Sequence, residues 1–215
     1  MPFVDIEGVR VLVEPGEKYM QIDDVGEKDI AKVWERVKAD YPGFTVDFAF
    51  HDTLAPIPFL KEIGAEVLED CTTMRLGKDD LIDMPVIKTE EISRENFSTF
   101  ADLHDEKEGF DVFWNSGKIL EDFENWKILA VIDQGKVTGY VTLRGGWEIY
   151  HLAGQGIEDR VSLLAAVVAS VAKTTLAAGN EIMFQVDRRD YLGLGAAMHT
   201  GFRKTGYYIC YRTVV

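Results

Sequence analysis

The apolar segment at residues 161–178 constrains this chain most strongly, because Leu, Ala and Val fill most of its positions. A helix that is apolar on nearly every side has to be buried on more than one face. Polar residues interrupt the segment from Lys173 onward, so its apolar part is shorter than the about 20 residues that a bilayer span needs. The segment therefore predicts a buried helix of a globular core.

Short β-branched segments alternate with helical patterns on both sides of this helix. Residues 3–13 and 126–143 each read as two strands around a turn that contains a glycine, Gly8 in the first and Gly135 in the second, which is typical of a β-hairpin. Residues 27–41 carry apolar side chains at helical spacing. The alternation predicts an α/β (α+β) fold, in which a mixed sheet is flanked by helices.

A polar connector at residues 78–85 separates a first part, 1–77, from a second part, 86–215. The two parts share an order of short motifs: Gly-Glu-Lys-Asp at 26–29 corresponds to Gly-Ile-Glu-Asp at 156–159. This shared order predicts an internal duplication whose first copy lacks the opening elements. Chance similarity between two α/β units is the alternative.

The charge balance limits the classes of partner. Lys and Arg total 23 and Asp and Glu total 37, which gives a net charge of −14. Nucleic acids and anionic membrane surfaces need cationic side chains to replace their counterions. We therefore expect no nucleic-acid and no membrane partner, and a cationic small molecule such as an amine is compatible with this charge.

Few residues suggest disulfides or metals. Two cysteines, Cys71 and Cys210, are too few for a disulfide framework, so we expect reduced packing residues in a cytoplasmic protein. The first residues lack the basic and apolar regions of a signal peptide. The histidines have no spacing typical of metal ligands, so no metal site is expected. They are His51, His104, His151 and His199.

After the connector, the predicted order is a strand at 86–89, two helices, a hairpin, a strand, a glycine-containing loop, a helix, a strand, a short helix that Gly201 ends, and a last strand. This order resembles the GNAT superfamily of acyl-CoA N-acyltransferases over about residues 86–215. The resemblance implies a sheet that splays in its middle, with the cosubstrate acetyl-CoA in the splay. It also makes residues 1–77 a truncated second copy, in a tandem arrangement.

The loop at 154–156 lies between a strand and the apolar helix, where backbone N–H groups and the helix dipole favour an anion. Aligned on the paired leucines that follow, the family's phosphate motif begins at Gln155, and Glu158 and Arg160 replace its two small residues. A carboxylate at this place repels phosphate, whereas Arg160 can pair with it. A register one residue away stays open. The resemblance implies these cosubstrate-binding residues: Tyr150, Leu152, Gln155, Gly156, Ile157, Glu158, Asp159, Arg160, Val161 and Asp190.

The resemblance also implies a base that accepts the amine proton, often a carboxylate on the strand before the loop. Glu148 is the candidate, because Glu148, Tyr150 and Leu152 are expected on one face of this strand, with His151 on the other. A solvated glutamate at a strand end is the alternative.

A tyrosine on the last helix often protonates the departing thiolate in this family, and Ala197 takes its place here. Tyr191 and Tyr211 are therefore the candidates for a substitute acid. Both residues also suit half-buried packing, which is the alternative.

Residues 89–124 hold 11 acidic residues against three basic ones, Arg94, Lys107 and Lys118. This excess predicts attraction of a cationic acceptor, and a solvated helix face is the alternative. The resemblance implies an N-acetyltransferase that transfers an acetyl group from acetyl-CoA to an amine by direct attack, and the charge favours a small cationic acceptor. A degenerate GNAT-like protein that binds CoA without turnover, and an interaction protein, are the other readings. A homodimer is left open.

Overall fold

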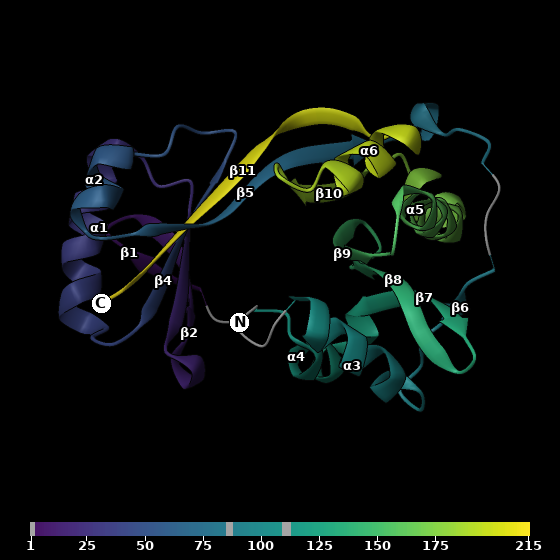
Figure 1. Ribbon diagram of the computed structural model, residues 1–215. Helices are drawn as coiled ribbons and strands as arrows, with labels where there is room; N and C mark the ends of the chain where they lie inside the picture. The colour runs from purple at the N-terminus through teal and green to yellow at the C-terminus, as the bar shows by residue number, and fades with distance from the viewer. Residues whose placement is uncertain (1–2, 85–87, 109–112) are drawn as a thin grey trace. The chain divides into compact units, whose positions relative to one another are not determined.

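A computed structural model describes residues 3–84, 88–108 and 113–215 (Figure 1). The chain divides into two compact units, which are treated separately below. Unit 1 consists of Met1–Thr72 together with Gly206–Val215, and unit 2 consists of Thr73–Thr205. The C-terminal residues thus lie with the first unit, whereas the sequence partition groups them with the second part.

Unit 1 is a sheet with two helices on one face (Figure 1). Its elements are β1 (Phe3–Ile6), β2 (Val9–Glu14), β3 (Tyr19–Asp23), α1 (Glu27–Asp40), β4 (Thr45–His51), α2 (Ile57–Glu62) and parts of β5 (Glu66–Leu76) and β11 (Arg203–Val214). A short 3-10 turn, Pro15–Glu17, precedes β3. The strand order is β1-β2-β3-β4-β11-β5.

The predicted first hairpin and helix are both confirmed. β1 and β2 pair antiparallel around Glu7 and Gly8, both of which have positive φ as a tight hairpin turn requires. Helix α1 turns its apolar stripe, which includes Val33 and Trp34, into the core of unit 1. The spacing that predicted the helix therefore also identified its buried face.

Unit 2 contains the remaining strands and the long apolar helix. Its elements are β6 (Glu90–Glu91), α3 (Phe97–Glu108), α4 (Ser116–Glu121), β7 (Trp126–Asp133), β8 (Lys136–Arg144), β9 (Glu148–Ala153), α5 (Ile157–Val171), β10 (Ile182–Asp187) and α6 (Tyr191–His199). Two 3-10 turns, Lys78–Asp80 and Phe123–Asn125, and a π-helical turn, Ala172–Leu176, complete it. The strand order is β11-β5-β10-β9-β8-β7-β6.

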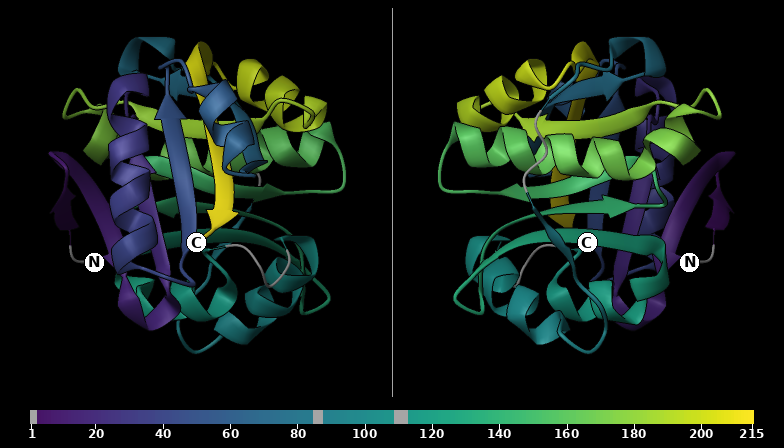
Figure 2. Two further views of the ribbon diagram at one scale, coloured as in Figure 1. Left: turned by 90° about the vertical axis from the view of Figure 1, so that its left-hand side faces the viewer. Right: turned by 90° about the vertical axis from the view of Figure 1, so that its right-hand side faces the viewer.

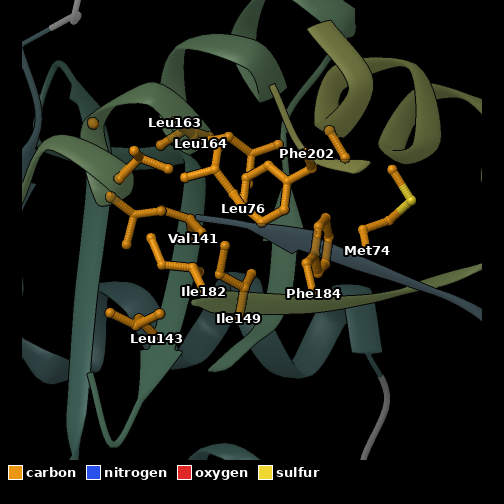
Figure 3. Packing of buried hydrophobic residues seen from close by; sticks show 14 of the residues in the cluster. Met74, Leu76, Val141, Leu143, Ile149, Leu163, Leu164, Ile182, Phe184 and Phe202 are labelled. Carbon is orange, nitrogen blue, oxygen red and sulfur yellow. The ribbon is translucent and has the colours of Figure 1, made fainter. Parts of the chain in front are cut away.

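Helices cover both faces of the sheet of unit 2. Helix α5 runs along the strands on one face, and α3 and α4 lie across the strands from it (Figure 2). Adjacent residues of β8 show this division: Val141 packs in the core under α5, and Tyr140 packs in the core under α3. The core under α5 includes Leu163, Leu164 and Phe184 (Figure 3). The predicted fold class, a mixed sheet flanked by helices, is confirmed.

Two predicted elements differ from the observed ones in their bounds. The predicted strand at 86–89 lies mainly outside the described residues, and the observed edge strand is Glu90–Glu91. The apolar helix begins earlier than expected, at Ile157, and changes to π-helical hydrogen bonding from Ala172. Gly156 precedes the first helical residue, so helix α5 begins directly at the loop.

Candidate functional site

The parallel strands β9 and β10 pair only at their first residues. The recorded pairs join Glu148 to Met183 and Ile149 to Phe184, although β9 continues to Ala153 and β10 to Asp187. Strands that stop pairing expose backbone N–H and C=O groups, and these groups need other partners. The sheet of unit 2 therefore opens between β9 and β10 toward the carboxyl end of both strands.

Unit 1 contains a similar strand, glycine-capped helix and parallel strand, but its sheet stays closed. β3 pairs with β4 along its whole length, Tyr19–Asp23 against Thr45–Ala49. One residue further, the Asp24 N–H still donates to the Ala49 carbonyl at 2.8 Å. Of the two units, unit 2 is thus the one with a strand opening beside a helix N-terminus.

Helix α5 begins at the edge of this opening. Its N-cap, Gly156, has extended backbone and no side chain to cap the helix, and the first helical hydrogen bond runs from the Arg160 N–H to the Gly156 carbonyl at 3.2 Å. The structure records no protein acceptor for the N–H groups of Ile157, Glu158 and Asp159 in the described residues. Unpaired N–H groups at a helix N-terminus form an anion site.

Side chains of the first turn of α5 already use part of this site. The Asp159 carboxylate accepts the Gln155 N–H at 3.2 Å. The Arg160 guanidinium donates from Nη1 to both carboxylate oxygens of Asp190 at 2.8 and 2.6 Å, and Asp190 also accepts the Gly193 N–H as the N-cap of α6. The cation that the sequence analysis assigned to phosphate is therefore held by a carboxylate. The Arg160 Nε is buried without a hydrogen-bond partner among the described residues.

The side-chain directions expected along β9 are wrong, because the strand contains a β-bulge. Thr142 pairs with His151 while Leu143 pairs with Ile149, so Tyr150 is the extra residue. As a result Tyr150 and His151 both lie on the α3 face, where their ring centroids are 5.2 and 6.4 Å from that of Trp126.

Leu152 lies on the α5 face, where it packs against the core of that side, while Tyr150 packs against the core under α3. Glu148, Tyr150 and Leu152 therefore do not share a face, and His151 is not opposite Tyr150. One inserted residue accounts for the whole error, because each step along a strand reverses the side-chain direction.

The proposed proton-transfer residues lie on three different elements, β9, α6 and β11. Glu148 is the first residue of β9, about 17 Å of extended chain from Ala153 at about 3.3 Å per residue, and it hydrogen-bonds the Tyr150 hydroxyl. Burial, followed by the charge of Glu148, raises the pKa of Tyr150. Tyr191 is the first residue of α6 and is 79% exposed. Tyr211 is buried in the core of unit 1, where its ring packs edge-on against Phe50.

The other predicted cosubstrate residues lie where the chain order placed them. Gln155, Gly156 and Glu158 belong to the loop and the first turn of α5, and Asp159 and Arg160 have the partners given above. Ile157 is exposed at the start of α5, whereas Val161 packs against the core.

A buried polar cluster that was not predicted from the sequence lies on the α3 face of the sheet. His104 of α3 is completely buried, and its Nδ1 lies 3.0 Å from the Tyr140 hydroxyl. The same hydroxyl lies 3.3 Å from Oε1 of Glu108. The rings of His104 and His151 meet edge to face at 4.6 Å, and His151 Nδ1 lies 3.0 Å from the Thr142 hydroxyl. The helical spacing of four residues between His104 and Glu108 was the available signal.

Burial shifts the protonation equilibria of this cluster. It raises the pKa of Glu108, against the lowering effects of His104, Tyr140 and Arg160. It also lowers the pKa of His151 to about 3, with a further contribution from His104. Burial and the charge of Glu108 raise the pKa of Tyr140. Perturbed groups of this kind collect at functional sites.

Two features are absent from the described residues. They contain no group of three or more His, Cys, Asp or Glu side chains able to hold a metal ion. None of their helices has the length and apolarity to cross a membrane.

Comparison with known proteins relates the chain to solved structures. No protein-family model and no curated protein sequence matches it. A functionally unknown conserved protein from Staphylococcus epidermidis matches 98% of this chain and 92% of its own, with a TM-score of 0.65 and 10% identity. A tandem GNAT protein from the clavulanic acid biosynthesis pathway matches 96% of this chain and 78% of its own, with a TM-score of 0.60 and 12% identity.

A GCN5-related N-acetyltransferase from Kribbella flavida is also similar, with a TM-score of 0.60 and 9% identity over 98% of this chain and 88% of its own. These similarities show that the chain has the GNAT fold. At such low identity they show the fold alone.

Proposed function

We propose that unit 2 is an acyl-CoA-dependent N-acetyltransferase that transfers an acetyl group to an amine of a small, cationic acceptor by direct attack. The observation that carries this proposal is the opening between β9 and β10, which lies beside the unpaired N–H groups at the start of α5. An extended molecule with an anionic end fits these two features together. Acetyl-CoA has this chemistry, and it would supply the activated acyl group.

The residues of the opening fit such a molecule. The N–H groups of Ile157, Glu158 and Asp159 would receive the diphosphate, since the site offers donors and the positive end of the helix dipole. The edge of β9 that has no recorded pairs with β10, over Tyr150–Ala153, would bind the amide-containing arm in the way that a strand binds its neighbour. An N–H group of this strand would also polarise the thioester carbonyl.

Holding the two reactants in line supplies a large part of the rate in such a site. A general acid is therefore desirable but not indispensable. Ala197 is completely buried, so the usual tyrosine position offers no proton. Tyr191 at the start of α6 and Glu148 on β9 remain candidates for proton transfer, and Tyr211 is the weakest because it is packed in the core of unit 1.

One observation favours a second function, binding of CoA without turnover. Glu158 and Asp159 place two carboxylates in the first turn of α5, and Asp159 already occupies the Gln155 N–H. Carboxylates near a diphosphate weaken its binding. A weakened site is compatible with a protein that senses the ligand and does not use it.

The acidic excess at 89–124 supports a cationic acceptor only in part, because several of its carboxylates have protein partners. Glu91 pairs with Lys127, Asp122 with Arg144, Glu124 with Arg94, and Asp105 accepts from Ser116. Both cysteines are buried thiols, which supports a cytoplasmic location.

Thermal unfolding with and without acetyl-CoA tests the proposal. A ligand at about 100 times its dissociation constant stabilises the folded state by about 2.7 kcal/mol. Release of CoA with tyramine, spermidine and lysine ethyl ester as acceptors then separates turnover from binding. No shift at millimolar acetyl-CoA contradicts both functions, and a shift without CoA release supports binding alone.

A matched pair of variants locates the site. An added Cβ at Gly156 meets no atom within 4 Å, and the same is true at Gly16 in unit 1. Gly156→Asp therefore adds a carboxylate at the α5 N-terminus without a steric clash, and we expect it to abolish the shift. Gly16→Asp should leave the shift unchanged.

A further inference from the structure

Three short contacts link the buried cluster into a chain that ends on a carboxylate. His104 Nε2 lies 3.0 Å from the Trp114 carbonyl oxygen, His104 Nδ1 lies 3.0 Å from the Tyr140 hydroxyl, and this hydroxyl lies 3.3 Å from Glu108 Oε1. Each contact joins two atoms that can accept a hydrogen bond. Each one therefore needs a proton between its atoms to be favourable.

Counting protons distinguishes two states of this chain. When Glu108 is ionised and His104 is neutral, the chain contains two protons, one on the imidazole and one on the Tyr140 hydroxyl. One of the three contacts is then left between two acceptors. A third proton completes the chain, either on Glu108 with a neutral imidazole, or on His104 with an ionised carboxylate. The two forms interconvert when the protons shift along the hydrogen bonds.

We propose that His104, Tyr140 and Glu108 form a proton relay whose outer end, the Glu108 carboxylate, takes a proton from the ammonium group of the acceptor. The role in acetyl transfer rests on the proposed function of unit 2, whereas the shared proton does not. Glu108 is the catalytic residue, because it is partly exposed, whereas His104 and Tyr140 are completely buried. Tyr140 and His104 act through it and are positioning residues.

The position of the relay in unit 2 supports this role. Tyr140 pairs with Ala153, the last residue of β9 before the loop, so the relay lies at the open end of the strands. Glu108 also senses the charges of Arg160 on α5 and Asp190 at the start of α6. The relay thus faces the same loop and helix ends as the proposed acyl-donor site.

The groups around the relay come from five elements. Glu108 faces His104 on its own helix, Tyr140 on β8, and the ion pair of α5 and α6. The buried end of the relay faces His151 of β9 at a ring distance of 4.6 Å. Asp105 adds a negative charge near Tyr140. Burial has the largest effect and raises the pKa of Glu108, which favours proton uptake closer to neutral pH.

The reaction balances with the relay as the first proton acceptor. An N–H bond of the ammonium breaks as an O–H bond forms on Glu108, and the amine becomes nucleophilic. The nitrogen then forms its bond to the acyl carbon, and the C–S bond breaks with its electron pair on sulfur. The second proton from nitrogen neutralises this thiolate. Glu108 returns its proton to water, so the products are the amide, the thiol and one proton.

NMR of the unliganded protein tests the shared proton without any turnover. We expect the Glu108 carboxyl carbon to titrate above the ordinary glutamate value of about 4.3, and the ring nitrogens of His104 to respond in the same step. Tyr140→Phe should uncouple the two responses. Tyr19→Phe is the matched control, because Tyr19 is a buried tyrosine of unit 1 that hydrogen-bonds Asp47. The relay would be overturned if the signals of Glu108 and His104 changed in separate steps and if Tyr140→Phe left both responses as they are in the wild type.

Kinetics test its role. We expect Glu108→Gln to lower kcat for acetyl transfer to tyramine or spermidine at pH 7 by about 100-fold or more, as loss of a general base does. Activity should recover toward pH 9 as the free amine accumulates. Glu106→Gln is the control, because this exposed residue of the same helix pairs with Lys107.

The two proposals fail differently. Equal pH profiles for the wild type and Glu108→Gln overturn the relay and leave the N-acetyltransferase intact. A wild type that neither binds acetyl-CoA nor releases CoA overturns the proposed function, and with it the transfer role of Glu108. Thermal shifts with acetyl-CoA should be the same for Glu108→Gln and the wild type, because Glu108 is no part of the diphosphate site.

Discussion

His151 should make unit 2 sensitive to mild acid. Its imidazole is buried between Thr142, which hydrogen-bonds Nδ1 at 3.0 Å, and the ring of His104 at 4.6 Å. Burial and His104 lower its pKa from 6.5 to about 3. Because the folded-state pKa is the lower one, the unfolded chain takes up the proton first as the pH falls. The contribution of neutral His151 to stability is therefore complete above pH 6.5 and is lost between pH 6.5 and pH 3.

The size of this loss follows from the shift. Each pKa unit corresponds to about 1.4 kcal/mol, so the full shift costs about 5 kcal/mol by pH 3. Between pH 7 and pH 5 the linkage relation gives a loss of about 2 kcal/mol. Glu108 acts in the opposite direction, because its pKa is raised and its contribution grows as the pH falls. A comparison that keeps Glu108 constant isolates the effect of His151.

Urea unfolding of the wild type and His151→Gln at pH 7 and pH 5 makes this comparison. Fluorescence can follow it, since the Trp126 ring stacks near His151 at 6.4 Å. Gln keeps a polar group beside Thr142 and does not titrate. We expect the wild type to lose about 2 kcal/mol more than the variant on acidification. Equal losses for both proteins would refute the reasoning, and so would a His151 ring that titrates above pH 6 by NMR.

Two further predictions concern the loop end of unit 2. Asp159→Asn removes a charge from the first turn of α5 and keeps an acceptor for the Gln155 N–H. Calorimetry should show that the variant binds acetyl-CoA up to about tenfold more tightly than the wild type at low salt, with a smaller difference at high salt. An unchanged affinity would place the diphosphate elsewhere. Gly139→Ala puts a Cβ 3.0 Å from the Ala153 carbonyl oxygen, and urea unfolding should show that the free energy of unfolding falls by about 1–3 kcal/mol. Gly16→Ala is the control and should cost little stability, because its added Cβ meets no atom within 4 Å. Equal losses of stability in the two variants would contradict the close contact.

The periodic parts of the fold could be predicted from the sequence. The hairpins around Gly8 and Gly135 were identified, because positive-φ turn residues between β-branched runs leave few alternatives. The start of α5 was missed, since Ile157–Arg160 is too polar to share the period of the buried helix that follows. Gly156 was nevertheless recognised as part of the loop before it.

The site was less predictable, because it depends on a single inserted residue and on contacts between distant elements. The bulge at Tyr150 has no marker such as glycine, and it reversed the assignment of His151. His104 and Glu108 share a helix face, but their link to Tyr140 depends on which strand lies under α3. No local pattern contains that information. The same applies to Arg160, whose partner Asp190 is 30 residues away.

Amide NMR during titration with acetyl-CoA tests the central claim most directly, namely that the opening beside α5 receives an acyl-CoA. We predict saturable shifts that are largest for the amides of Gly156–Asp159 and for the unpaired end of β9, with small changes in unit 1. The claim would be contradicted if the amide chemical shifts of that loop did not change at millimolar acetyl-CoA. It would also be contradicted if saturable shift changes were confined to unit 1.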